Sequence, residues 1–199
     1  RIDDMFKRLN RVGGKNLLKM NSISVDSINS SQLAMLIDTL KPSLIIGATL
    51  NEWFALNTAD ACYPYRKTLT LIGMPNWDGF RNLYDKDRYK DFSILYTSPH
   101  YDGERNAYSE YLGNEYFTKY RMAPSDNAIK GFEATYYFMQ ILMNYGDAFM
   151  EHLNENKYAP LHEFNFSPVS YNPNGVVDYF ENKHVFIMQI LNGVNSKAW

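Results

Sequence analysis

Cysteine is almost absent from this 199-residue chain, and the single Cys62 excludes an internal disulfide. Its apolar surroundings, ADACYPY, predict a buried thiol rather than a reactive one. No apolar run approaches the roughly 18 residues that a membrane-spanning helix needs. No cationic start is followed by an apolar signal segment either. We therefore expect no transmembrane segment in this chain.

A strong charge of either sign is also missing. The formal net charge is −2 and the sequence pI is about 6.1, so electrostatics favours neither nucleic acid nor an anionic membrane surface as a partner. Hydrophobic residues make up 45% of the chain and aromatic residues 16%, which is typical of a globular protein. One folded domain is expected.

The motifs of metal and phosphate sites are absent from the sequence. The histidines at positions 100, 152, 162 and 184 form no i, i+4 pair and no HExxH motif. The charged run 85–91 has Lys90 where a calcium loop needs glycine, and Tyr96 where it needs an acid. Gly13–Gly14 lacks the rest of any phosphate-binding pattern. We expect no metal and no cofactor.

Nucleophilic catalysis has little support. The chain has no GxSxG elbow and no cysteine–histidine arrangement. Ser98 is the only serine with a suggestive neighbour, since Pro99 and His100 follow it. A hydrolase using Ser98 and His100 therefore stays as an alternative, although no acid is specified to orient the histidine. The leading expectation is a protein without catalytic residues.

What the sequence does contain is three short apolar segments that each end in a polar or aromatic turn, at 43–53, 68–79 and 92–103. Such runs predict buried strands of an open α/β sheet. Ligands collect at the carboxyl ends of strands in such sheets. The candidate groups there are Thr49, Asn51, Glu52, Trp53, Asn76, Trp77, Asp78, His100 and Tyr101. Alternatively, Asn51 caps a helix, Trp53 packs under that helix and Trp77 covers a loop.

Other elements follow from periodicity and turn residues. A strand with its exit is expected over 15–25, and helices over 31–41, 52–65, 103–121 and 127–146. Ser30 and Ser31 are candidate caps for the first of these helices. Segments 176–180 and 184–191 are β-like and flank a turn at 181–183, which predicts a terminal hairpin within 171–199. The chain opens on what reads as the tail of a helix, so we expect it to be part of something longer.

The order of these elements resembles the carboxyl-terminal part of type I periplasmic solute-binding proteins, the leucine/isoleucine/valine-binding family. The resemblance covers nearly the whole chain, through LIDTLKPSLIIGAT, LTLIGMPNW, ILYTSPHYD, FTKYRMAPSDNAIKGFEATYYFMQIL and NPNGVVDYFENKHVFIMQILNG. It implies a three-layer, mainly parallel sheet with helices on both faces, plus the terminal hairpin. Residues 1–199 would form a single lobe of a two-lobe clamshell, with helices over 125–170 crossing to the other lobe.

The resemblance also implies a site, a partner and a compartment. Thr49, Leu50, Asn51, Met74, Asn76 and Trp77 inherit the ligand-binding role, and we add His100 and Tyr101 from the third strand end. The second turn offers Pro75 or Asn76 where the family's amino-acid binders often place an acid. The expected partner is a small polar solute, amino-acid-like or derived from the cell wall. The expected location is the periplasm or cell envelope.

Two further expectations follow. The alternative to solute binding is an envelope interaction module that binds a protein or peptidoglycan partner through the same architecture. If one lobe is missing, the chain should bind a small ligand weakly and expose the apolar face that meets the other lobe. Tyr136, Tyr137 and Phe138 are the expected exposed residues, and they predict self-association.

Overall fold

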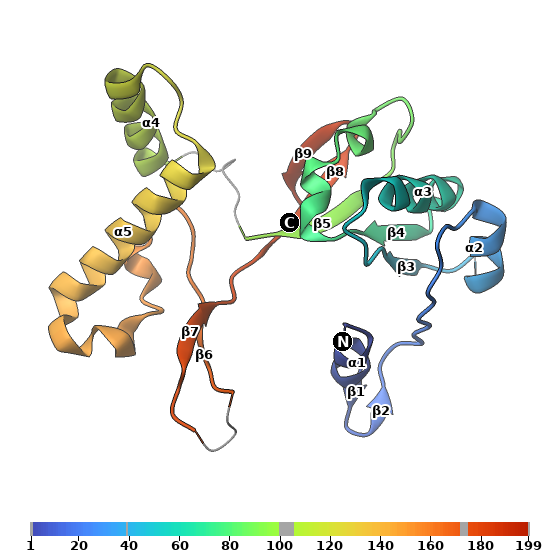
Figure 1. Cartoon of the computed structure of the whole chain (residues 1–199), viewed down its shortest axis with the longest axis horizontal. Helices are drawn as coiled ribbons and strands as arrows, with labels where there is room; N and C mark the ends of the chain where they lie inside the picture. The colour runs from blue at the N-terminus through green and yellow to red at the C-terminus, as the bar shows by residue number, and fades with distance from the viewer. Residues whose placement is uncertain (1, 39, 100–105, 172–174, 199) are drawn as a thin grey trace.

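The computed structural model describes residues 2–38, 40–99, 106–171 and 175–198 of the chain. These residues form a mixed α/β structure with two distinct units, drawn in Figure 1 beside a short N-terminal segment. We call residues 29–98 and 186–198 the sheet unit, and residues 106–183 the helical unit. The sheet unit is thus discontinuous in sequence, and the helical unit is inserted between its strands β5 and β8.

The N-terminal segment contains three short elements, α1 (Ile2–Leu9), β1 (Arg11–Val12) and β2 (Lys15–Asn16). β1 and β2 form an antiparallel pair closed by Gly13 and Gly14, whose φ angles of 58° and 79° suit glycine. The predicted strand over 15–25 is wrong beyond Asn16, and residues 17–25 form no strand. Strands need a partner for their backbone groups, and β2 pairs only with the two residues of β1.

The sheet unit is built on five strands in the order β3-β4-β5-β8-β9. β3, β4 and β5 run parallel, which confirms the three strands predicted from the apolar runs. The other two pairings, β5 with β8 and β8 with β9, are antiparallel, so the sheet is mixed rather than mainly parallel. The bounds are β3 (Ser43–Ile46), β4 (Leu69–Ile72), β5 (Ile94–Ser98), β8 (Phe186–Leu191) and β9 (Val194–Lys197).

Short helices precede β3 and connect the parallel strands. They are α2 (Ser30–Leu36), α3 (Glu52–Cys62) and the 3₁₀ helices η1 (Tyr63–Tyr65), η2 (Pro75–Gly79) and η3 (Arg81–Tyr84). The N-cap of α2 is Asn29, in a capping box with Gln32, rather than Ser30 or Ser31. α3 follows its predicted cap Asn51, whose side chain accepts a hydrogen bond from Phe54 N–H at 3.0 Å. Its buried stripe Ala55, Thr58, Ala59 and Cys62 has helical spacing and faces the core.

Only one face of the sheet is well covered. On that face the core contains Leu69, Leu71, Ile94, Tyr96, Met188 and Ile190. On the other, Leu44, Ile46 and Val194 are 53%, 39% and 63% exposed, and we call this the open face. The prediction of helices on both faces is therefore wrong for the described residues. The long helix over residues 126–145 packs against residues 146–158 of the helical unit.

The terminal hairpin forms from different strands than predicted. β7 (Tyr179–Asn182) pairs with β6 (Phe166–Val169), so the expected pairing of 176–180 with 184–191 is wrong. The hairpin joins β8 to β9 through Asn192 and Gly193, with φ of 50° and 78°. An Asn-Gly pair between apolar segments is a strong signal for this type of turn, and it was readable in the sequence.

The helical unit contains α4 (Ala107–Tyr120), α5 (Asp126–Tyr145), η4 (Gly146–His152) and η5 (Asn156–Tyr158). Ser125 caps the start of α5 and Gly146 its end, in agreement with the helix predicted over 127–146. Tyr137 is fully buried, stacks on Phe164 with ring centroids 4.2 Å apart and donates to Leu153 O at 2.8 Å. The prediction of an exposed face is therefore wrong for Tyr137, and Phe138 is exposed.

Burial of Cys62 generates a first prediction. Removal from water disfavours the thiolate and raises the pKa of Cys62 to about 12. We expect the folded protein to resist labelling by a disulfide reagent at mildly alkaline pH, and the guanidinium-unfolded chain to react with one equivalent. Folding favours the neutral thiol, so the raised pKa of Cys62 contributes to the free energy of unfolding. That contribution is lost as the pH rises from 9 toward 12. In Cys62→Ala the free energy of unfolding should lack this loss. Rapid labelling of the native protein would contradict the burial.

Candidate functional site

The carboxyl ends of β3, β4 and β5 lie at one edge of the sheet because these strands are parallel. The chain leaves this edge after Ser98 toward the helical unit (Figure 1). We call the turns that follow the first two strands, residues 47–53 and 73–79, the strand-end turns. They contain six of the eight predicted ligand-binding residues. His100 and Tyr101, the other two, lie outside the described residues.

Trp77 is the structural centre of the strand-end turns. Its side chain is fully buried and lies against Gly47 and Gly73, the residues that follow β3 and β4. A Cβ on Gly73 would lie 2.1 Å from the indole, and one on Gly47 would lie 2.7 Å from it. The indole N–H donates to Thr49 O at 2.9 Å. Trp77 therefore has no face available to a ligand, and its predicted contact role is wrong.

The turn after β3 is held by its own polar groups. Thr49 Oγ1 accepts from Asn51 N–H at 3.1 Å, while the Asn51 side chain caps α3. An acidic residue follows the cap: Glu52, in the first turn of α3, accepts from Asn82 Nδ2 at 3.0 Å. Asn51 thus serves mainly as a helix cap, the alternative that the sequence left open. Met74 is half-buried against the core and its carbonyl accepts from Trp77 N–H.

Asn76 connects the two turns. Its Nδ2 donates to Leu50 O at 3.1 Å across 26 residues of sequence. Its Oδ1 is buried and has no hydrogen-bond donor among the described residues. A buried acceptor without a partner costs about 1–3 kcal/mol, so an N–H or O–H donor that reached this oxygen would be bound favourably. Asn76 is the predicted site residue whose hydrogen-bonding capacity is visibly unused.

Two large apolar side chains stand exposed beside these polar groups. Leu50 is 69% exposed and Trp53 is 61% exposed. Leu50 is one of the eight predicted ligand-binding residues. Trp53 was a candidate at the strand ends but was not among those eight, and the alternative that it packs under its helix is wrong. Helical periodicity contained the signal, since Trp53 lies off the stripe formed by Ala55, Thr58 and Ala59. An exposed indole beside amide and hydroxyl groups suits a small polar molecule that has an apolar face.

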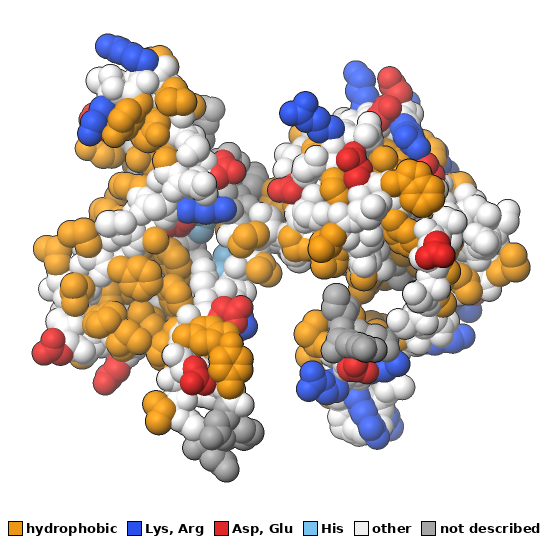
Figure 2. Space-filling view, viewed as in Figure 1, with side chains coloured by type: hydrophobic (Ala, Val, Ile, Leu, Met, Phe, Trp, Pro, Cys, Tyr) orange, Lys and Arg blue, Asp and Glu red, His pale blue; other side chains and the backbone are white. Residues whose placement is uncertain are grey.

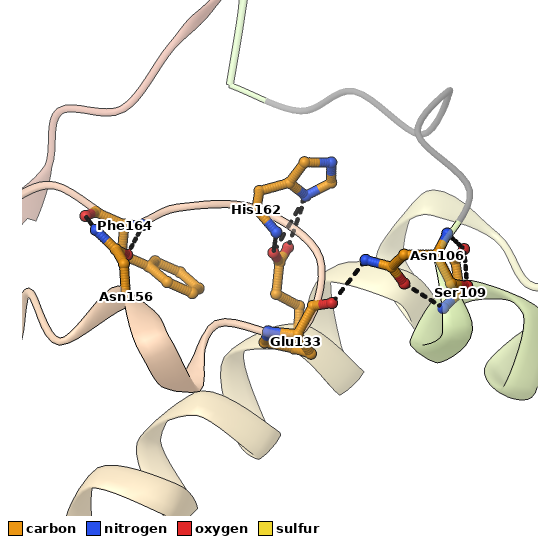
Figure 3. Close-up of polar contacts among 7 residues, drawn as sticks. Asn106, Ser109, Glu133, Asn156, His162 and Phe164 are labelled. Atoms are coloured by element: carbon orange, nitrogen blue, oxygen red, sulfur yellow. Dashed lines mark hydrogen bonds and ion pairs between the residues drawn. The ribbon is translucent and has the colours of Figure 1, made fainter.

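A buried acid–base pair lies in the helical unit. Figure 3 shows Glu133 of α5 pointing at His162, whose backbone N–H donates to Glu133 Oε1 at 2.7 Å and whose Nδ1 lies 3.1 Å from that oxygen. Both side chains are about nine-tenths buried. The His162 ring also meets Phe186 of β8 edge-on, with centroids 5.1 Å apart. The pair thus ties the loop after η5 to α5 and places it against the sheet unit.

Asn106 extends this arrangement to α4. Its side chain accepts from Ser109 N–H at 2.9 Å as the helix cap, and its Nδ2 donates to Pro160 O at 2.9 Å (Figure 3). One residue therefore fixes both the start of α4 and the loop that contains His162. These contacts explain the placement of the loop beside the sheet unit, and they suggest a structural role for the Glu133–His162 pair.

The helical unit also has an apolar pocket of about 360 Å³. We call it the aromatic pocket; its lining residues are Phe138, Phe149, Met150, Leu153, Phe166, Val177, Asp178, Tyr179 and Phe180. Hydrophobic side chains gather over this unit in the space-filling view of Figure 2. Among the described residues, no three histidine, cysteine or acidic side chains are placed to hold a metal ion. The described helices include none long and apolar enough to cross a membrane.

No family model, curated protein or solved structure matches the chain. Its function must therefore be inferred from its own sequence and geometry.

The contact between Trp77 and the two glycines generates a second prediction. Gly73→Ala forces a methyl group into the indole and should destabilise the protein by about 1–3 kcal/mol, the usual cost of overpacking. Gly131→Ala is the matched control, because it lies inside α5 with nothing within 4 Å of its added methyl group. It should be neutral or stabilise by up to about 1 kcal/mol. Urea unfolding measures both, and equal effects would contradict the contact.

Proposed function

We propose that this chain is a non-catalytic binding module for a small polar solute, held at the strand-end turns. One observation carries the proposal: the carboxyl ends of three parallel strands lie at the edge from which the chain passes to the helical unit. In open α/β sheets, that edge is where ligands bind. The resemblance to type I periplasmic solute-binding proteins agrees with this placement. It also supports a lobe of that type and a location in the cell envelope.

The residues that we assign to binding differ from the eight ligand-binding residues predicted from the sequence. Trp53 and Leu50 supply exposed apolar contact area, and Asn76 Oδ1 supplies a hydrogen-bond acceptor. Thr49 and Asn51 shape the turn between them. Glu52 is already engaged by Asn82. A solute with an apolar face and an N–H or O–H donor therefore fits better than one that needs a carboxylate.

Closure would use the two connections between the units. The chain crosses between β5 and α4 and again between β7 and β8, and His162 meets Phe186 beside the second crossing. Two units joined at few points can rotate about those points and enclose a ligand. Under this proposal, the Glu133–His162 pair keeps the helical side of the hinge rigid while the units move.

The second candidate is an interaction module, and the aromatic pocket favours it. Phe138, Met150, Val177 and Tyr179 around this pocket are all more than a third exposed. Apolar surface of this kind is typical of protein contacts. Binding of a protein or peptidoglycan partner at the aromatic pocket would leave the strand-end turns unused, so the two candidates predict different sensitive residues.

Thermal shift of the 199-residue chain tests the proposal. The panel contains amino acids, sugars, nucleosides and muropeptides. A solute at one hundred times its dissociation constant should stabilise the protein by about 2.7 kcal/mol, which raises the midpoint by several degrees. Trp53→Ala should reduce the shift strongly, because it removes the exposed indole of the strand-end turns.

Tyr171→Ala is the matched control, since Tyr171 is an exposed aromatic residue of the helical unit, far from these turns in the fold. A shift that survives Trp53→Ala would argue against the strand-end turns. A shift with muropeptides that is lost in Phe138→Ala but not in Trp53→Ala would favour the interaction module. No shift with any solute would contradict solute binding.

A further inference from the structure

The open face of the sheet has the composition of a buried surface. Strand registers place Leu44, Ile46, Ile72 and Ile187 on this face together with Thr70, Leu95, Thr97, Gln189, Leu191, Val194 and Ser196. None of these residues is charged. Sheets that face water on one side normally alternate apolar and polar residues, with the polar ones outside. Here the outward positions are mostly aliphatic, which is the pattern of a face that another element covers.

Both edges of this face are exposed, at Leu44 and Ile46 of β3 and at Val194 of β9, whereas Leu95 in the centre of the sheet is buried. Two exposed aliphatic residues lie together only at the β3 edge. Ile72 on the adjacent strand is half-buried. The uncovered area at that edge lies over β3 and β4 and is about as long as a short helix, because each strand has four residues.

The N-terminal segment has a matching unpartnered surface. Ile2, Met5, Phe6 and Leu9 recur in α1 at the i, i+3, i+4, i+7 spacing of a single apolar stripe. At 100° per residue, Asp4, Lys7 and Arg8 lie away from that stripe. Met5 and Leu9 nevertheless remain 44% and 67% exposed. An eight-residue helix is marginal by itself in water, so α1 needs a surface to pack against.

We propose that α1 docks on the open face of the sheet, with its apolar stripe over Leu44 and Ile46. The occupant is tethered to its site: residues 17–29 join β2 to α2, and extended chain covers about 3.3 Å per residue, roughly 40 Å in all. Figure 1 draws α1 and the β1–β2 pair as a separate segment, joined to α2 by this linker. Docking leaves Lys7 and Arg8 in water and covers the largest exposed aliphatic residues of β3.

The aromatic pocket is the other apolar surface on which α1 could dock, but the linker over residues 17–29 favours the open face. That pocket belongs to the helical unit, whereas the linker enters the sheet unit at α2, the element directly before β3. A short tether raises the effective concentration of α1 at the nearer surface. The open face also lacks charge, so the carboxylates and basic groups of α1 can all stay on the solvent side.

Disulfide trapping in a Cys62→Ala background tests the docking. Leu9→Cys paired with Leu44→Cys should form an intramolecular crosslink on mild oxidation, detected by faster migration of the non-reduced chain. Lys7→Cys paired with Leu44→Cys is the matched control, since Lys7 lies on the polar side of α1 and should crosslink at least tenfold more slowly. Equal rates for the two pairs would overturn the proposal. A crosslink found only in dimers would assign the open face to a second copy and would overturn it too.

Trypsin gives an independent readout on the chain without added cysteines. Docking should protect the bonds after Lys7, Arg8 and Arg11, and the double change Leu44→Asp with Ile46→Asp should speed their cleavage several-fold. Leu40→Asp is the control, because Leu40 is 88% exposed and lies before β3. If cleavage is equally fast in all three proteins while circular dichroism stays unchanged, α1 is not docked and the proposal fails.

Discussion

The packing of one indole against two glycines organises the edge of the sheet at which the parallel strands end. Trp77 fills the space over Gly47 and Gly73, so the ends of β3 and β4 are held at a fixed separation. Its N–H then fixes the carbonyl of Thr49, and that turn presents Asn51 to cap α3. The positions of Leu50, Trp53 and Asn76 all follow from this contact. The buried Trp77 thus fixes the position of the exposed Trp53.

The two units are stabilised by different interactions. The sheet unit has an aliphatic and aromatic core beneath α3. The helical unit relies on stacked rings, Tyr137 on Phe164 and Phe164 on Phe166 with centroids 5.5 Å apart, and on the Glu133–His162 pair. Removing one partner of a buried hydrogen-bonded pair costs more than losing an exposed ion pair. The helical unit should therefore depend more on individual polar residues than the sheet unit does.

Local patterns in the sequence predicted the elements, but not their partners. The three parallel strands, the cap Asn51 and the ends of α5 at Ser125 and Gly146 were predictable, because each depends on neighbouring residues. The burial of Trp77 was not, since its site forms only when Gly47 and Gly73 meet across the sheet. The strand partners of 176–191 were misassigned because two turns competed, and Asn192–Gly193 was the better signal. The exposure of Trp53 was predictable, because helical spacing places it off the buried stripe of α3.

The discontinuity of the sheet unit imposes an order on folding during synthesis. β8 lies between β5 and β9 in the sheet, yet the ribosome makes residues 106–183 before it makes β8. Until then, the edge of β5 has no neighbour and its apolar residues have no cover on that side. The helical unit meets β8 through the contact of His162 with Phe186, but its stacked rings and the Glu133–His162 pair lie within residues that emerge earlier, so it can fold first. A nascent chain paused before residue 186 would therefore carry a folded helical unit beside an unfinished sheet, and this is the species that chaperones would have to protect.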